Sequence, residues 1–220
     1  MPKTKPPKKE SSTPRFHMEF KNGVQRHAWD TFQKNDVLFL IGSAGTGKTH
    51  LAMAFAIHEI LQRSRKRIIL TRPIVEAGEN LGYLPGSFEE KVSPYMLPLY
   101  DCMKKLVGVS GLHHDLVAAS LEVAPLAYMR GRSLSHSVCI FDEAQNATFS
   151  QLKLFLSRMD ENSKMIITGD PEQSDLGSAS GLVDVLARLQ GVPGIGVVKF
   201  EKDSIVRHPL VAAILEKLEN

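Results

Sequence analysis

The sequence predicts an α/β fold, a mostly parallel β-sheet with helices on both faces. Short apolar runs recur along the chain, and segments with apolar residues at helical spacing separate them. Continuous apolar runs are typical of strands that are buried on both faces, and such strands need helical crossovers to run parallel. Because ligands bind at the carboxyl ends of strands in these sheets, functional residues are expected at that edge.

The predicted elements follow the chain in a regular alternation. Strands are expected at 36–42, 67–71, 138–142, 164–169 and 196–200. A further strand at 123–127 contains Pro125, which favours an edge or terminal position. Helices are expected at 48–64, 150–159, 180–190 and 209–218. Residues 72–111 are rich in glycine and proline and are expected to be mainly irregular.

A single globular domain of residues 16–220 is predicted, preceded by a basic tail of residues 1–15. The tail has a charge of +4 and the whole chain a net charge of +3, which leaves −1 for the rest of the chain. The tail is rich in proline, lysine and serine, so it is expected to be disordered. Two interpretations stay open: the tail solubilises the protein, or it tethers the protein to nucleic-acid phosphates.

The two cysteines, Cys102 and Cys139, are too few for a disulfide framework. Cys139 lies within an apolar run and is expected to be a buried hydrophobic residue rather than a reactive thiol. The cytoplasm is therefore the expected location. No apolar run reaches the roughly 18 residues that a membrane span needs, so no membrane association is expected.

A glycine-rich loop follows the first predicted strand and opens the first predicted helix. It matches the pattern G-x-x-x-x-G-K-[ST] with the residues Gly42, Ser43, Ala44, Gly45, Thr46, Gly47, Lys48 and Thr49. Its glycines allow backbone N–H groups to approach phosphates, and the helix N-terminus adds further donors. We expect Lys48 to reach the β- and γ-phosphates of ATP and Thr49 to bind Mg²⁺.

Two acids end the predicted strand at 138–142, within the stretch IFDEAQ. A parallel sheet places them at the same edge as the glycine-rich loop. Asp142 is expected to hold Mg²⁺ through water, and Glu143 to orient and activate the attacking water. Gln145 completes the stretch, and it either relays the nucleotide state or braces the loop.

Two further glutamines are candidate nucleotide contacts. Gln173 follows the next strand, in ITGDPEQ, where its amide can sense the γ-phosphate. Asp170 in the same stretch either anchors the loop or supports the metal. Gln25, upstream of the first strand, carries an amide that can pair with both a donor and an acceptor on the adenine edge.

These motifs together resemble the PhoH family, the phosphate-starvation-inducible ATPases related to superfamily 1 helicases. The resemblance extends from about Phe16 to the end of the chain. It is carried by TRPIVEAGENLGYLPGSFEEKVSPYMLPLYD, VAPLAYMRGRS, FDEAQNAT, TGDPEQSDL and DSIVRHPLV. It implies a single RecA-like ATPase domain whose nucleotide site contains Gln25, the glycine-rich loop, Asp142, Glu143 and Gln173.

Arg207, in SIVRHPLV, is the candidate for an arginine that stabilises charge on the phosphates during hydrolysis. Such an arginine is worth roughly 10³ to 10⁵ in rate. Two-domain helicases supply it from a second motor domain, and no second motor domain is expected in this sequence. We expect Arg207 to act in trans within a homo-oligomer, hypothetically a hexameric ring. The alternative is that Arg207 pairs with a nearby acid such as Asp203.

Nucleic-acid contacts are expected from basic and aromatic side chains. The candidates for phosphate contacts are Arg72, Arg130 and Arg132, and Tyr83, Phe88 and Tyr95 either stack on bases or pack locally. The leading function is an ATPase that remodels or translocates on RNA or single-stranded DNA. The alternatives are a nucleotide-regulated scaffold with little turnover and a small-molecule kinase, which the Asp142–Glu143 pattern disfavours.

Overall fold

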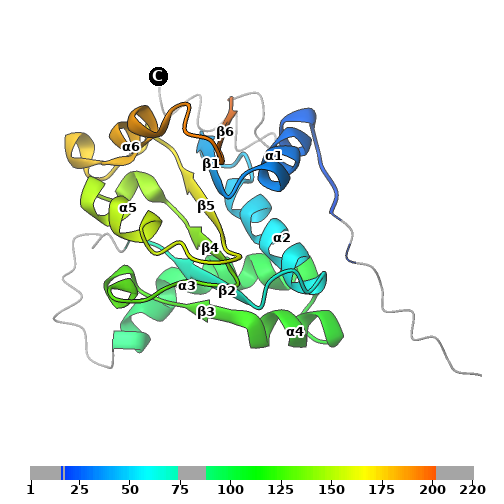
Figure 1. The fold of residues 1–220 in the computed structure, drawn as a ribbon. Helices are drawn as coiled ribbons and strands as arrows, with labels where there is room; N and C mark the ends of the chain where they lie inside the picture. The colour runs from blue at the N-terminus through cyan, green and yellow to red at the C-terminus, as the bar shows by residue number, and fades with distance from the viewer. Residues whose placement is uncertain (1–15, 17, 74–87, 202–220) are drawn as a thin grey trace, which may run out of the picture.

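The structure, a computed structural model, describes residues 16, 18–73 and 88–201. Within these residues, six strands form one parallel sheet in the order β3-β2-β4-β5-β1-β6, which confirms the predicted fold class (Figure 1). The strands are β1 (Val37–Gly42), β2 (Arg67–Thr71), β3 (Leu121–Val123), β4 (Ser137–Phe141), β5 (Lys164–Gly169) and β6 (Ile195–Phe200). The predicted tail and the predicted helix at 209–218 lie outside the described residues.

Helices cover both faces of the sheet (Figure 1). The α-helices are α1 (Gly23–Lys34), α2 (Lys48–Leu61), α3 (Phe88–Val107), α4 (Leu112–Ser120), α5 (Phe149–Leu156) and α6 (Leu182–Leu189). Short 3₁₀ helices are η2 (Leu126–Met129), η3 (Ala144–Asn146) and η4 (Gly177–Ala179). None of the described helices is long and apolar enough to cross a membrane.

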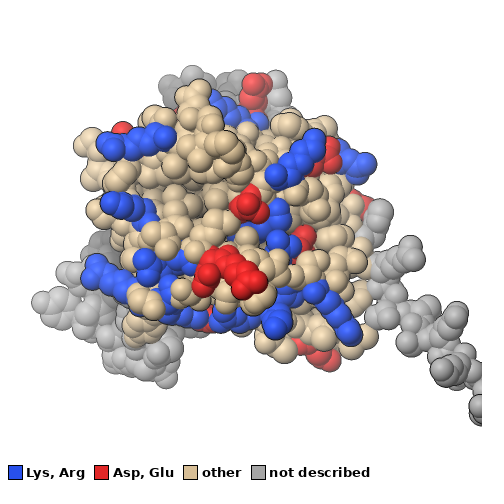
Figure 2. All heavy atoms as spheres, in the orientation of Figure 1, with Lys and Arg blue, Asp and Glu red and all other residues tan. Residues whose placement is uncertain are grey.

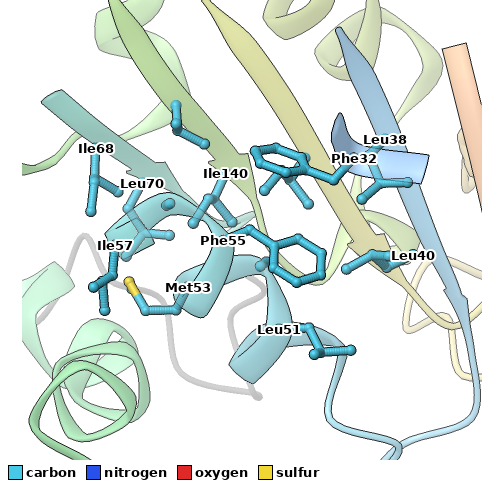
Figure 3. Close-up of a cluster of buried hydrophobic side chains, with 14 of the residues drawn as sticks. Phe32, Leu38, Leu40, Leu51, Met53, Phe55, Ile57, Ile68, Leu70 and Ile140 are labelled. Carbon is cyan, nitrogen blue, oxygen red and sulfur yellow. The ribbon is translucent and has the colours of Figure 1, made fainter. Parts of the chain in front are cut away.

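The alternation of side chains along each strand produces two separate hydrophobic cores. Leu38 and Leu40 of β1 face α1 and α2, and they pack with Phe55 in the cluster drawn in Figure 3. Phe39 of β1 faces the opposite way and packs with Phe155 of α5. The central strands are buried on both faces, which explains why they are continuous apolar runs without a polar alternation.

The strand register brings several loops to one edge of the sheet. Ile41 at the end of β1 is paired with Gly169 at the end of β5, and Phe141 at the end of β4 is paired with Ile167. Thr71 at the end of β2 is paired with Phe141. The chain segments that follow these strands therefore begin close together, as the sequence motifs require.

Two sequence expectations differ from the structure. Residues 88–107 form the long helix α3 instead of an irregular segment, although Pro94 and Pro98 lie within it. The glycines of this region all lie outside the helix, before Phe88 or after Val107. The helix is anchored by Leu99 and Met103, which are buried against the α2 side of the sheet. The strand expected at 123–127 is β3, which ends at Val123. It does lie at the edge of the sheet.

Helices α1 and α4 were not expected from the sequence. Helix α1 carries a recognisable start signal, because the side chain of Asn22 accepts a hydrogen bond from the backbone N–H of Gln25. Ala28 and Phe32 then follow at helical spacing and are buried. Helix α4 has only one fully buried residue, Val117, so its apolar pattern is weak.

Gly42 provides a test of how tightly the glycine-rich loop is fixed by the sheet. Its φ is +143°, and a Cβ at this position would lie 2.0 Å from the backbone oxygen of Phe200 in β6. We predict that Gly42→Ala lowers the free energy of unfolding by about 2 kcal/mol or more, since overpacking of this kind costs about 1–3 kcal/mol. Urea titration measures the change. Gly23→Ala, where nothing lies within 4 Å, is the matched control and is expected to be neutral or stabilising. Equal stability of the two variants would contradict this assignment.

Candidate nucleotide site

A cavity of about 450 Å³ opens at the carboxyl ends of β1, β2, β4 and β5. Five of the eight residues of the glycine-rich loop contribute to its wall, together with both acids that follow β4 and residues from α3. The lining residues are Ala44, Gly45, Gly47, Lys48, Thr49, His50, Arg72, Pro98, Cys102, Lys105, Asp142, Glu143, Thr168, Asp170 and Gln173. The structure thus brings together residues that are widely separated in the sequence, and most of the predicted site is among them.

The glycine-rich loop adopts a conformation that suits phosphate binding. Gly45 and Gly47 have φ values of +80° and +87°, which glycine adopts without steric cost. The Nζ of Lys48 donates hydrogen bonds to the backbone oxygens of Gly42 and Ser43, at 2.5 and 2.8 Å. The Lys48 ammonium is therefore held across the mouth of the loop, where a bound phosphate group would lie.

Asp142 is the buried centre of the site, with 1% of its surface exposed. Its Oδ1 accepts hydrogen bonds from the hydroxyls of Thr49, at 2.7 Å, and Thr168, at 2.6 Å. Burial raises the pKa of the Asp142 carboxyl, and the charge of Glu143 adds to this rise. The two hydroxyls and the charge of Arg72 lower the pKa.

The donor set around Asp142 fits Mg²⁺, which prefers oxygen ligands and keeps several waters when it binds one or two protein groups beside phosphates. Thr49 and Asp142 supply a hydroxyl and a carboxylate oxygen within 2.7 Å of each other. Among the described residues, no group of three or more His, Cys, Asp or Glu could hold a metal ion alone. The residues therefore fit a cation shared with a nucleotide rather than a cation bound by protein alone.

Glu143 follows β4 in a left-handed conformation with φ of +56°. This turn directs its half-exposed side chain into the cavity. One carboxylate oxygen lies 3.6 Å from the guanidinium of Arg72, and the other accepts a hydrogen bond of 2.6 Å from the amide of Gln145. Both oxygens of the carboxylate are thus oriented by neighbouring side chains.

Gln145 joins this carboxylate to the segment that follows β5. Its Oε1 accepts a hydrogen bond from the backbone N–H of Asp170 at 3.1 Å, and its backbone oxygen accepts one from Ser174 at 2.8 Å. Beside it, Asn146 and Asp175 exchange two hydrogen bonds of 2.9 Å. Gln145 is only 4% exposed, so its amide is a buried bridge between the two segments.

The other predicted nucleotide contacts occupy different positions. Gln173 is exposed and lines the cavity, as its predicted contact with a phosphate requires. Gln25 is buried and lies behind the loop, where its Nε2 is 3.6 Å from the position of a Cβ on Gly47. Its Oε1 accepts a hydrogen bond from the backbone N–H of Lys21. Arg207 lies outside the described residues.

The three arginines proposed for nucleic-acid contacts are separated in the structure. Arg72 lines the nucleotide cavity beside Glu143. Arg132 forms an ion pair of 2.6 Å with Glu122, whereas Arg130 is exposed. Tyr83 and the side chains of Phe88 and Tyr95 lie outside the described part of the chain.

Several cavity residues were missed by the sequence analysis. Thr168 was not predicted as a site residue, although it lies near the end of β5, and Asp170 and Gln173 after the same strand were predicted. Pro98, Cys102 and Lys105 line the cavity from one face of α3 at helical spacing, a signal hidden by the expectation of an irregular segment. Burial raises the pKa of the Cys102 thiol to about 12 and that of Cys139 to about 11, so both thiols stay protonated, as expected for Cys139.

The fold and the site together define a class of protein. A glycine-rich loop joins β1 to α2, and two acids follow β4, with β5 between the two strands. This is a RecA-like domain of the P-loop NTPase class. A family model described as "PhoH-like protein" matches residues 17–219, so the chain belongs to the PhoH family.

Curated relatives agree with this assignment. A PhoH-like protein of Bacillus subtilis (strain 168) is 49% identical over 194 residues, which cover 87% of this chain and 61% of the relative. Protein PhoH of Escherichia coli (strain K12) is 41% identical over 194 residues, which cover 86% and 55%. The chain thus spans 55–61% of the length of these two relatives.

The large terminase of a thermophilic bacteriophage, in complex with ADP, is a structural neighbour. Its TM-score is 0.57 at 13% sequence identity, and the match covers 89% of this chain and 49% of the terminase. At this identity, the likeness shows a shared fold alone.

Replacing Gln145 by leucine tests its role as a buried bridge. We predict a loss of about 1–3 kcal/mol in the free energy of unfolding, because the backbone N–H of Asp170 loses its buried partner. Urea titration measures this change. Asn146→Ala is the control, since it removes the neighbouring but exposed amide and is expected to cost less than about 1 kcal/mol. An equal or larger loss of unfolding free energy in Asn146→Ala would contradict the role of Gln145 as a buried bridge.

Proposed function

We propose that this PhoH-family domain is a Mg²⁺-dependent ATPase whose hydrolysis is coupled to binding and remodelling of RNA or single-stranded DNA. The observation that carries the proposal is the arrangement of three groups at one cavity. Lys48 lies at the phosphate loop, Thr49 and Thr168 hold the carboxylate of Asp142, and the side chain of Glu143 reaches the cavity. Hydrolysis needs this combination of phosphate, cation and water positions.

Each residue has a separate role in the proposed reaction. Lys48 exchanges its bonds to the loop carbonyls for bonds to the β- and γ-phosphates. Thr49 and Asp142 would hold Mg²⁺, which would neutralise charge at those phosphates. Glu143 accepts a proton from the attacking water as the water oxygen bonds to the γ-phosphorus. The bond from that phosphorus to the bridging oxygen breaks, and ADP leaves with the electron pair. Gln173 contacts the γ-phosphate. Gln25, behind the loop, is proposed to bind the adenine edge once the nucleotide is in place.

The proposed assembly is a homo-oligomeric ring, hypothetically a hexamer. Head-to-tail contacts between copies close into a ring when the rotation permits, and each copy could then insert a catalytic arginine into its neighbour's site. Arg207 is the candidate. Among the described residues, Arg72 lines the cavity but is paired with Glu143, so we do not assign it the role of the catalytic arginine.

One observation favours a second candidate function, a nucleotide-regulated scaffold with little turnover. Both oxygens of Glu143 have partners, Arg72 and Gln145, so the carboxylate must give up one of these contacts before it can turn toward a water. Under this alternative, ATP sets the assembly state and is rarely hydrolysed. Turnover measurements separate the two functions.

The ATPase proposal predicts different results for two substitutions. Lys48→Ala is expected to weaken ATP binding at least tenfold, because it removes the main cation at the phosphates. Glu143→Gln is expected to retain ATP binding and lose at least 100-fold in turnover, since an amide cannot accept the proton. Phosphate release, with and without single-stranded RNA or DNA, is the measurement, and nucleic acid is expected to raise the wild-type rate. Tight ATP binding without turnover at any RNA concentration supports the scaffold instead.

Mixing two inactive variants tests whether Arg207 acts in trans. Lys48→Ala lacks a working nucleotide site but keeps Arg207, and Arg207→Ala has the reverse defect. In a ring of mixed subunits, some sites regain both groups, so ATP hydrolysis is expected to recover to a measurable fraction of the wild-type rate. Mass measurement in solution accompanies the assay. A monomer that shows no recovery on mixing would refute the arrangement.

A further inference from the structure

A basic groove of about 500 Å³ runs beside α5, away from the nucleotide cavity. Its walls are the outer side of α5 with the residues just after it, and the segment at Arg130 and Gly131. Three of the eight lining residues are basic, namely Arg130, Lys153 and Arg158, and none is acidic. Figure 2 shows Lys and Arg side chains on the side of the molecule that carries α5. In a chain that is near neutral outside its tail, this is a marked local excess of positive charge.

Arg158, in the wall of the groove, is a half-buried cation without a described carboxylate partner. Its guanidinium donates to the hydroxyl of Ser157 at 3.1 Å and to the backbone oxygen of Arg132 at 3.5 Å. Its Nε is buried and has no hydrogen-bond partner among the described residues. This buried Nε cannot itself reach a ligand, and Arg65 has the same unpartnered Nε although it is paired with Glu59. An anion in the groove would instead supply the counter-charge that the Arg158 guanidinium lacks among the described residues.

The other half-buried arginines that the structure describes are all neutralised. The ion pairs are Arg65 with Glu59, Arg67 and Arg132 with Glu122, and Arg72 with Glu143. Arg158 is therefore the exception among them, since partly buried charges are normally paired. Exposed Arg130 and Lys153 add two further cations to the same groove, and neither forms an ion pair with a described acid.

The groove has the chemistry of a surface for phosphate groups. Ser150, Gln151 and Ser157 also line it, and their hydroxyl and amide groups are typical donors to phosphate oxygens. No aromatic side chain lines the groove, so it lacks the stacking surface that reads bases. A partner held here would be bound through a repeated anionic backbone, independently of its sequence.

We propose that this groove binds the phosphate backbone of single-stranded nucleic acid, with Arg130, Lys153 and Arg158 as the contacts. The inference rests on the proposed function and assigns it a surface. Arg132 is paired with Glu122, so we no longer expect it to contact phosphates. Lys153 takes its place beside Arg130. The choice of a single strand over a duplex is taken from the proposed function, since no aromatic side chain lines the groove.

A short segment of chain connects the groove to Glu143, the proposed catalytic carboxylate. Helix α5 begins six residues after Glu143, and the intervening segment contains η3 and the bridging residue Gln145. Thr148 caps α5 through a reciprocal pair of hydrogen bonds with Gln151, which lines the groove. A strand bound along α5 would therefore contact the helix whose start is fixed to the nucleotide site.

The test is the affinity of the full chain for a fluorescent oligouridine of about 20 nucleotides, long enough to span a single-strand site. Fluorescence anisotropy measures it at several salt concentrations. The double variant Arg130→Ala/Lys153→Ala is expected to bind at least tenfold more weakly. Its plot of log affinity against log salt is expected to be less steep by about 1.4, because two phosphate contacts are lost and each contributes about 0.7. Lys34→Glu is the control, because Lys34 is exposed in the last turn of α1. The affinity of this variant for oligouridine is expected to stay within twofold of wild type.

The outcomes separate this inference from the proposed function. All variants keep residues 1–15, so any contribution of the tail is common to them, and thermal melting confirms that each is folded. If the wild type binds oligouridine and the double variant binds equally well, the groove assignment is wrong and the proposed function stands. If the wild type binds no single strand, both fail. Equal competition by poly-glutamate of matched length would show that the groove takes acidic peptides, which also overturns the assignment.

Discussion

The buried carboxylate of Asp142 is the contact on which the arrangement of the site depends. It receives hydroxyl hydrogen bonds from Thr49 at the start of α2 and Thr168 near the end of β5, and it directly follows β4. Three elements thus meet at one oxygen atom. The meeting requires β1, β4 and β5 to run parallel and to end at the same level, which the two hydrophobic cores on either face of the sheet enforce.

The polar network around this carboxylate is extensive because a buried charge needs partners. Burial raises the pKa of Asp142, and the two hydroxyls offset part of that rise. Glu143 beside it is held by Arg72 and Gln145, and Gln145 continues the network to Asp170. The backbone N–H of Glu143 donates to the hydroxyl of Thr168 at 3.4 Å, and that of Gln173 donates to the backbone oxygen of Asp170 at 3.1 Å. The residues proposed to bind metal, activate water and sense the phosphate are therefore connected by hydrogen bonds. Substitution of one of these residues is therefore expected to shift the positions of the others.

The sequence predicted the parts of the site that depend on short-range patterns. The glycine-rich loop between a strand and a helix, and the acids at the end of an apolar run, are local signals, and the parallel sheet then places them together. Contacts between distant segments were not predictable in the same way. The ion pair of Arg132 with Glu122 depends on the path of the chain after β3, and nothing near Arg132 in the sequence indicates it.

Helix α3 could not be predicted from composition, because its own Pro94 and Pro98 and the glycines that flank it are all typical of irregular segments. Its cavity face, Pro98, Cys102 and Lys105, became visible only with the helix itself. Arg158 was missed for a different reason: a single arginine after a helix carries no sequence signal, and its significance lies in the carboxylate that it lacks among the described residues.

The most direct measurement of the central claim is the Mg²⁺ dependence of ATP binding in Thr168→Val and Thr168→Ser. Valine keeps the shape of Thr168 but removes the hydroxyl that holds Asp142, whereas serine keeps the hydroxyl. Loss of such a supporting contact typically weakens metal-dependent binding about 10–100-fold. The account predicts this loss for valine with Mg²⁺ present, no change in EDTA, and near wild-type behaviour for serine. Equal weakening of both variants, or a loss for valine that persists in EDTA, would contradict it.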